Sequence, residues 1–156
     1  MKYANVLVPY DGSDSSKKAL NTALEYVNLG IAGNVTVFFA APVPQFETQD
    51  FMVAEYISGS KPLSPAETAE MQERYVQFHR EKLAKDLGDV VEKAGDSLTI
   101  AIGQGKPSKA ILEYAHDHGT DLIVMGSRGL NAVAGMLGSV SYAVLRNAEC
   151  PVMIER

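Results

Sequence analysis

The stretch VLVPYDGS, residues 6–13, decides the fold class because it joins a buried strand to the start of a helix. Its first three residues are consecutive apolar side chains, a pattern typical of a strand covered on both faces of a sheet. Asp11 and Gly12 form a turn, and either Ser13 or Asp14 can cap the helix that follows. A strand that leads at once into a helix is the repeating unit of a parallel sheet.

The same alternation continues along the rest of the chain. Strands are expected over residues 4–10, 35–41, 98–102, 122–125 and 152–154. The helices between them are expected to begin near residues 14, 65, 107 and 139, and the second of these is expected to run without interruption to Ala94. Ser64, Pro65 and Glu67 form a capping box with proline at the first helical position. We therefore predict an α/β fold of one domain, residues 1–156, with an open five-stranded parallel sheet and helices on both faces.

Composition limits the classes of function. Hydrophobic residues make up 46% of the 156 residues and charged residues 21%, as in ordinary globular proteins. The net charge of −5 disfavours general nucleic-acid binding, which needs an electropositive surface. Cys150 is the single cysteine, which suits a reducing compartment. No stretch approaches the roughly 20 apolar residues of a membrane span, and the first residues lack a signal-peptide pattern, so we expect a cytoplasmic protein.

Two loops are candidates for ligand binding, because ligands of open parallel sheets bind beyond the carboxyl ends of the strands. Residues 9–13 follow the first strand, and the glycine-rich residues 126–141 follow the fourth. Glycines let a backbone approach an anion closely, Gly138 and Ser139 precede a helix whose first amides can bind phosphate, and Arg128 adds positive charge. The spacing fits neither a Walker loop nor the dinucleotide fingerprint. Asp11 can either accept from ribose hydroxyls or serve as a plain turn residue.

Four segments together resemble the universal stress protein family: VLVPYDGS, the GSRG after an apolar strand, the later GSVS and the final CPVMI. The resemblance covers essentially the whole chain. It implies the strand order 3-2-1-4-5 and a homodimer formed through the C-terminal strand, Val152–Ile154. It also implies an ATP-binding motif of the form G-x2-G-x9-G-S/T, although here eight residues instead of nine separate Gly129 from Gly138.

Carried over residue by residue, the resemblance implies a site for ATP, AMP or ADP, with or without Mg²⁺. The phosphate side would be formed by Gly126, Arg128, Gly129, Gly138, Ser139, Val140 and Ser141. The adenine and ribose side would be formed by Pro9, Tyr10, Asp11, Ala40 and Met125, with Gly105 at its border. Tyr10 either stacks on adenine or packs in the core. No catalytic residue and no metal ligand are assigned.

The leading interpretation is a stress-response protein that acts by binding an adenine nucleotide, which bridges and orders the two loops. One alternative is a nucleotide-free dimeric scaffold, which the shortened spacing favours. Another is a slow ATPase or phosphotransferase, for which Asp11 is the one obvious carboxylate. Residues 42–63 break the alternation and carry Phe46, Phe51, Met52 and Tyr56. They are expected either to pack on the sheet or to form a lid or a surface for an unknown protein partner.

Overall fold

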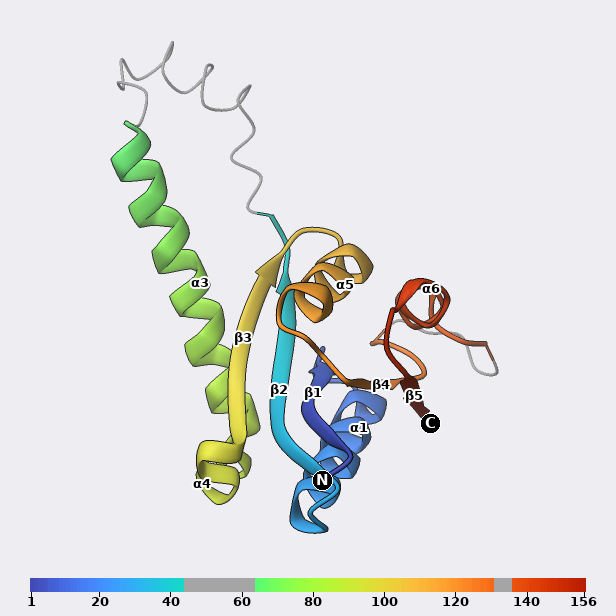
Figure 1. Cartoon of the computed structure of the whole chain (residues 1–156). Coiled ribbons are helices and arrows are strands. Elements are labelled where there is room, and N and C mark those ends of the chain that lie inside the picture. Colours follow the sequence, from blue (N-terminus) through green and yellow to red (C-terminus); the bar gives the residue numbers. More distant parts are fainter. Residues whose placement is uncertain (44–63, 131–135) are drawn as a thin grey trace.

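The computed structural model describes residues 1–43, 64–130 and 136–156, which form one α/β domain around a five-stranded sheet (Figure 1). The order across the sheet is β3-β2-β1-β4-β5, and every neighbouring pair is parallel. The structure confirms both the predicted α/β fold class and the predicted strand order 3-2-1-4-5. The strands in chain order are β1 (Tyr3–Pro9), β2 (Ala32–Ala41), β3 (Leu98–Gln104), β4 (Leu122–Gly126) and β5 (Val152–Glu155).

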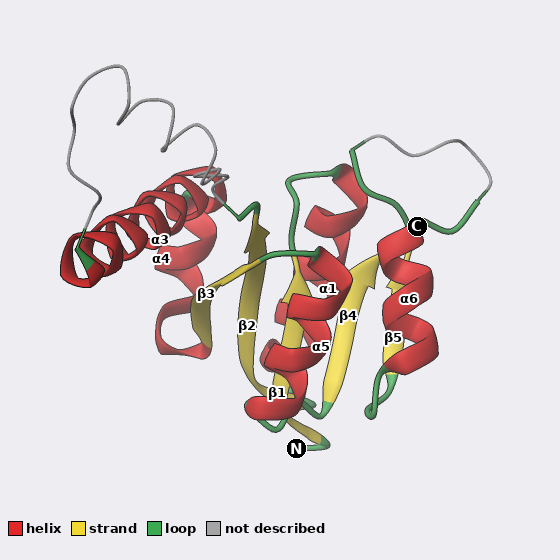
Figure 2. Ribbon diagram, turned by 90° about the horizontal axis from the view of Figure 1, so that it is seen from above, coloured by secondary structure: helices red, strands yellow, loops and turns green. Residues whose placement is uncertain are grey.

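Helices cover both faces of the sheet. On one face lie α1 (Asp14–Asn28), α3 (Pro65–Leu87) and α4 (Asp89–Ala94), with a short 3-10 turn, η1 (Gly95–Ser97), leading into β3. On the other face α5 (Pro107–Asp117) and α6 (Ser139–Asn147) lie side by side, as Figure 2 shows. None of the helices in the described ranges is long and apolar enough to cross a membrane.

Two apolar cores, one on each face, follow from the alternation of side chains along the strands. Val6 and Val8 of β1 face α1 and α3, while Leu7 between them faces α5 and α6. Along β2, Val37 belongs to the first core and Phe38 to the second. All of these side chains are buried. Because the central strands bury both faces, they read as continuous apolar runs in the sequence.

The predicted helix starts are confirmed in detail. The hydroxyl of Ser13 caps α1 by accepting from the amide of Ser16. Ser64 and Glu67 form the reciprocal capping box at the start of α3. Gly30 adopts a positive φ of 69° just beyond α1, a conformation that ends helices at little cost for glycine.

One prediction about the middle of the chain is wrong. The helix expected to run to Ala94 is interrupted at Gly88, whose φ of 51° and ψ of −129° separate α3 from α4. On the same helix, the half-buried His79 stacks on Phe39 at 5.5 Å between ring centroids and meets Tyr75 edge-on. Burial consequently lowers the pKa of His79 below its ordinary value, and nearby Lys82 adds to the shift. The predictions for Phe46, Phe51, Met52 and Tyr56 lie outside the described residues.

Candidate functional site

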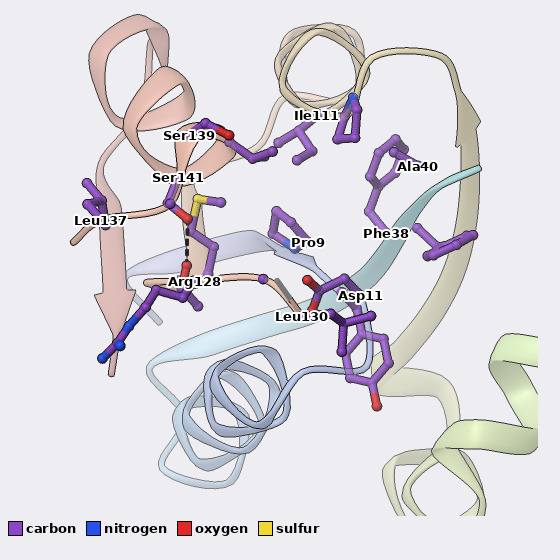
Figure 3. Close-up of a pocket in the computed structure, with 18 of the residues that line it drawn as sticks. Pro9, Asp11, Phe38, Ala40, Ile111, Arg128, Leu130, Leu137, Ser139 and Ser141 are labelled. Carbon is purple, nitrogen blue, oxygen red and sulfur yellow. Dashed lines mark hydrogen bonds between the residues drawn. The ribbon is translucent and has the colours of Figure 1, made fainter. Parts of the chain in front are cut away.

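A cavity of about 550 Å³ opens at the carboxyl ends of the central strands (Figure 3). It lies between the loop after β1, residues 9–13, and the loop after β4, residues 126–141, which are called the first and fourth loops below. Of the predicted site residues, twelve line it: Pro9, Tyr10, Asp11, Ala40, Met125, Gly126, Arg128, Gly129, Gly138, Ser139, Val140 and Ser141. Gly105 is not among the lining residues. Its amide donates to the carbonyl of Ala41 at 3.1 Å, and its φ of 102° serves the turn after β3.

Asp11 is held in one orientation by the turn that it begins. Its Oδ1 accepts from the amide of Ser13 at 3.0 Å and from the Ser13 hydroxyl at 2.5 Å. Oδ2 lies on the side of Gly129, only 2.7 Å from where a Cβ on that glycine would stand. Asp11 is exposed, so this second oxygen can accept further hydrogen bonds at the cavity.

The first and fourth loops are joined by direct hydrogen bonds. The Ser15 hydroxyl donates to the carbonyl of Arg128 at 2.5 Å, and the Ser13 hydroxyl lies 3.4 Å from the same oxygen. Gly126 packs so closely on Ser15 that a Cβ at this glycine would overlap both the side chain and the backbone of Ser15. A residue without a side chain at position 126 is therefore needed for β4 to end against the start of α1.

The N-terminus of α6 forms the opposite wall and differs in two respects from the predicted phosphate cradle. The Gly138 amide already donates to the Ser127 carbonyl at 2.8 Å, and the Ser141 hydroxyl donates to the Gly126 carbonyl at 2.8 Å (Figure 3). Neither hydrogen is therefore available to a ligand. The amides of residues 139–141 and the hydroxyl of Ser139 have no acceptor among the described residues. These are the groups that can receive an anion at this helix end.

Tyr10 packs in the first core and does not form a stacking platform. Only 6% of its surface is exposed, and it belongs to the cluster that contains Leu83 and Leu87 of α3. Burial raises the pKa of the Tyr10 hydroxyl above its ordinary value, and the carboxylates of Asp86 and Asp11 add to the shift. Of the two roles left open by the sequence, the structure assigns the core role to this ring.

Further apolar residues of the cavity were not identified from the sequence. Phe38 and Ile111 face the cavity from β2 and α5 (Figure 3). Phe38 could have been found, because it lies two residues before Ala40 on the same face of the strand. The remaining lining residues missed by the sequence reasoning are Phe39, Pro107, Leu130, Met136 and Leu137.

Charge in the cavity is sparse. Among the described lining residues Arg128 is the one cation and Asp11 the one carboxylate. The guanidinium of Arg128 extends away from the centre of the cavity (Figure 3). No group of three or more His, Cys, Asp or Glu side chains that could hold a metal ion occurs in the described ranges. The walls thus offer an apolar slot, a carboxylate at one end and backbone amides at the other.

Comparisons of the sequence and of the structure with known proteins point to the same family. Residues 2–156 match the sequence model described as the universal stress protein family. The Thermus aquaticus protein named "Universal stress protein in QAH/OAS sulfhydrylase 3'region" is 31% identical over 159 residues, which cover 99% of this chain and 99% of that protein. The solved structure of universal stress protein UspA from Lactobacillus plantarum has a TM-score of 0.65 at 26% identity and covers 100% of this chain and 99% of its own.

Two further solved structures share the fold and are complexes with a nucleotide. One is a universal stress protein in complex with cAMP, with a TM-score of 0.58 and 22% identity over 100% of this chain and 98% of its own. The other is a universal stress protein family protein from Arabidopsis thaliana with AMP bound, with a TM-score of 0.54 and 21% identity over 97% of this chain and 90% of its own.

Proposed function

This chain belongs to the universal stress protein family, and we propose that it binds an adenine nucleotide in the cavity between the first and fourth loops. As a stress-response protein of this family, it would act by binding the nucleotide and not by rapid catalysis. The observation that carries the proposal is that the oriented carboxylate of Asp11 faces, across one apolar cavity, α6 amides that have no acceptor among the described residues.

Each part of a nucleotide has a chemical counterpart in this cavity. The base is flat and largely apolar at its faces, and Phe38, Ile111 and Met125 provide apolar walls for it. The ribose hydroxyls are donors, and Oδ2 of Asp11 is an acceptor whose carboxyl group is already oriented by Ser13. The phosphate is an anion, and the N-terminus of α6 supplies amides and the positive end of a helix dipole.

The comparisons support this assignment at the level of ligand class. Two proteins with this fold carry AMP or cAMP, which share adenosine and a single phosphate. We extend the class, adenine nucleotides, to this chain because its cavity lies at the predicted strand ends and contains all but one of the predicted residues. The sequence interpretation named ATP, with AMP or ADP as alternatives, and any of them would use the same adenosine contacts.

We also propose that the chain forms a homodimer through β5. This strand is at the edge of the sheet and is only half-buried, so one row of its backbone groups is open to a partner strand. On the adjacent α6, Tyr142 and Leu145 are 56% and 48% exposed. The molar mass measured by light scattering tests the proposal, and a monomer at tens of micromolar would refute it.

The decisive test of nucleotide binding is calorimetric titration of the purified protein with adenosine, AMP and ATP. We expect binding by at least AMP and adenosine, and a loss of roughly tenfold or more in an Asp11→Ala variant, since hydrogen bonds to charged groups contribute about 1.5–3 kcal/mol. Asp96→Ala is the matched control, because it removes the same charge from an exposed position in η1, which precedes β3. Absence of heat with all three ligands would refute the proposal.

Retained nucleotide gives an independent readout. The chain contains no tryptophan, so bound adenine would dominate absorbance near 260 nm after gentle purification. Mass spectrometry of the heat-released supernatant then identifies the nucleotide. If the purified protein shows no excess absorbance near 260 nm and the calorimetric titrations release no heat, the nucleotide-free scaffold that the sequence left as an alternative would be favoured.

A further inference from the structure

We propose that Arg80 of α3 keeps the open edge of β3 from pairing with the same edge of a second copy of the chain. The proposal does not depend on nucleotide binding, since neither Arg80 nor β3 lines the cavity. Two observations carry it: the guanidinium of Arg80 is bonded to the backbone of this edge, and β3 itself contains no charged residue. The protection that an exposed edge strand needs therefore comes from the neighbouring helix.

The backbone groups of β3 alternate between β2 and the open edge, the side of β3 on which no strand lies among the described residues. Just beyond β3, the amide of Gly105 donates to the carbonyl of Ala41 in β2 at 3.1 Å, so the odd-numbered residues of β3 face β2. The N–H and C=O of one strand residue point to the same side, so residues 98, 100, 102 and 104 face the open edge. The carbonyl of Ile100 agrees with this alternation, because it accepts from a side chain outside the sheet.

Arg80 lies at the middle of this open edge. Helix α3 packs beside β3, and Nη1 of Arg80 donates to the carbonyl of Ile100 at 2.9 Å (Figure 1). Arg80 is exposed and forms no ion pair with any described residue, so its positive charge stays at the edge. A strand that paired with β3 would have to displace this guanidinium from Ile100 and would then lie against its charge.

The composition of β3 makes such protection necessary. Its sequence, LTIAIGQ over residues 98–104, contains no charged residue and no proline, and isoleucine and threonine have high strand propensity. Exposed strands of this composition are the segments that pair most readily with strands of other chains. The strand at the other edge of the sheet, β5, differs in that it ends in the charged Glu155.

A second copy of the chain is the partner that suits this edge. Two neutral β3 strands can meet about a two-fold axis without opposing like charges, and each supplies donors and acceptors to the other. The edge at β5 is the one proposed above for the homodimer, so an unprotected β3 would give each copy two edges for association. Copies joined through both edges form chains that do not close. Arg80 consequently restricts association to the β5 edge.

The test compares the wild-type chain with an Arg80→Ala variant by sedimentation velocity, from micromolar to hundreds of micromolar protein. At the highest concentration we expect the weight-average mass of the variant to exceed that of the wild type at least about twofold. Arg74→Ala is the matched control, because it removes the same charge from an exposed position of α3 at which the arginine pairs with Glu70. Equal masses of Arg80→Ala and wild type at every concentration, or an equal rise in Arg74→Ala, would overturn the proposal.

Two further measurements distinguish pairing at β3 from association of a misfolded chain. In hydrogen exchange at high concentration, the amides of Ile100 and Ile102 should gain protection in Arg80→Ala, whereas the amide of Ala101, which faces β2, should not change. Thr99 is exposed on β3 itself, so adding Thr99→Lys to the variant should return its mass to that of the wild type. Unchanged exchange at Ile100 and Ile102, or association that persists in the double variant, would refute the proposal.

Thermal unfolding checks that the variant is folded. Arg80→Ala should unfold within about 4 °C of the wild type, because the change removes one exposed hydrogen bond. A larger drop in Tm that accompanies the rise in mass would assign the association to unfolding and would contradict the role given to Arg80.

Discussion

Replacement of Gly129 by alanine tests whether Asp11 holds the ribose. The glycine does not adopt a positive φ, so alanine is compatible with its backbone and the effect depends on space alone. The new Cβ would stand 2.7 Å from Oδ2 of Asp11, and the next nearest atom, Cγ of the same residue, is 4.0 Å away. Since the obstacle is the end of one exposed side chain, the carboxylate should rotate away while the fold persists.

The magnitude follows from the bonds that the rotation breaks. Asp11 would lose its hydrogen bonds from the amide and hydroxyl of Ser13, and with them the orientation of Oδ2. A ligand hydroxyl bonded to a carboxylate contributes about 1.5–3 kcal/mol, which corresponds to roughly 10- to 150-fold in affinity. The free energy of unfolding should fall by no more than about 1 kcal/mol, because the site is exposed.

Calorimetry with adenosine and with AMP distinguishes this route from a direct clash of the new methyl group with phosphate. If Gly129→Ala acts through Asp11, both ligands should weaken by the same factor. The Asp11→Ala variant should show a similar loss, and the double variant should show little more than either single one. A variant that weakens AMP and leaves adenosine unchanged would refute the reasoning, as would fully additive losses in the double variant.

Three further predictions concern stability and protonation. Gly103→Ala should cost about 1–3 kcal/mol and lower Tm by roughly 3–10 °C in thermal unfolding, because its Cβ would overlap the buried ring of Phe38. Ser64→Ala should remove the capping box and weaken the exposed start of α3 by about 0.5–2 kcal/mol, seen as faster amide exchange there with little change in Tm. The hydrogen bond and charge of Glu149 raise the pKa of His116. The contribution of this pair to folding stability is therefore complete below the ordinary histidine pKa, and it is lost as the pH rises through the raised pKa of His116. In an NMR titration, Glu149→Gln should return that pKa toward its ordinary value.

The sequence predicted the order of elements well, because apolar runs and helix caps are local signals. It misplaced the boundaries where those signals stop. β2 begins at Ala32 and not at Val35, since its first residues, Ala-Gly-Asn, have low strand propensity and enter the strand through pairing with β1. β3 extends to Gln104 because Gly103 pairs with Ala40 and lets Phe38 pack against the strand.

The site was predictable to the extent that topology determines it. Loops after the first and fourth strands of a 3-2-1-4-5 sheet meet at the point where the strand order reverses. The topology alone therefore brings positions 11 and 129 together. The identity of the free donors was not predictable, because it depends on which polar groups the protein satisfies internally. Gly138 and Ser141 fit a phosphate motif by spacing, yet both donate to carbonyls of the fourth loop.

Hydrogen bonds near the cavity bear on the expected role of a ligand. According to the sequence interpretation, the nucleotide bridges the first and fourth loops and orders them. In the structure, Ser15 in the first turn of α1 donates to the carbonyl of Arg128, and the amide of Ser127 donates to the carbonyl of Glu155 in β5 at 2.6 Å. Glu155 in turn accepts from Thr22 of α1 at 2.9 Å.

These bonds hold parts of both loops in place within the protein, so we expect little binding free energy to be lost in ordering them. The same bonds connect the fourth loop to β5, the edge proposed for the dimer. A ligand held at Asp11 and α6 consequently acts on a network that reaches this edge through two hydrogen bonds of Glu155, one from Ser127 and one from Thr22. Coupling between nucleotide and partner would in that case be a shift within this hydrogen-bonded network.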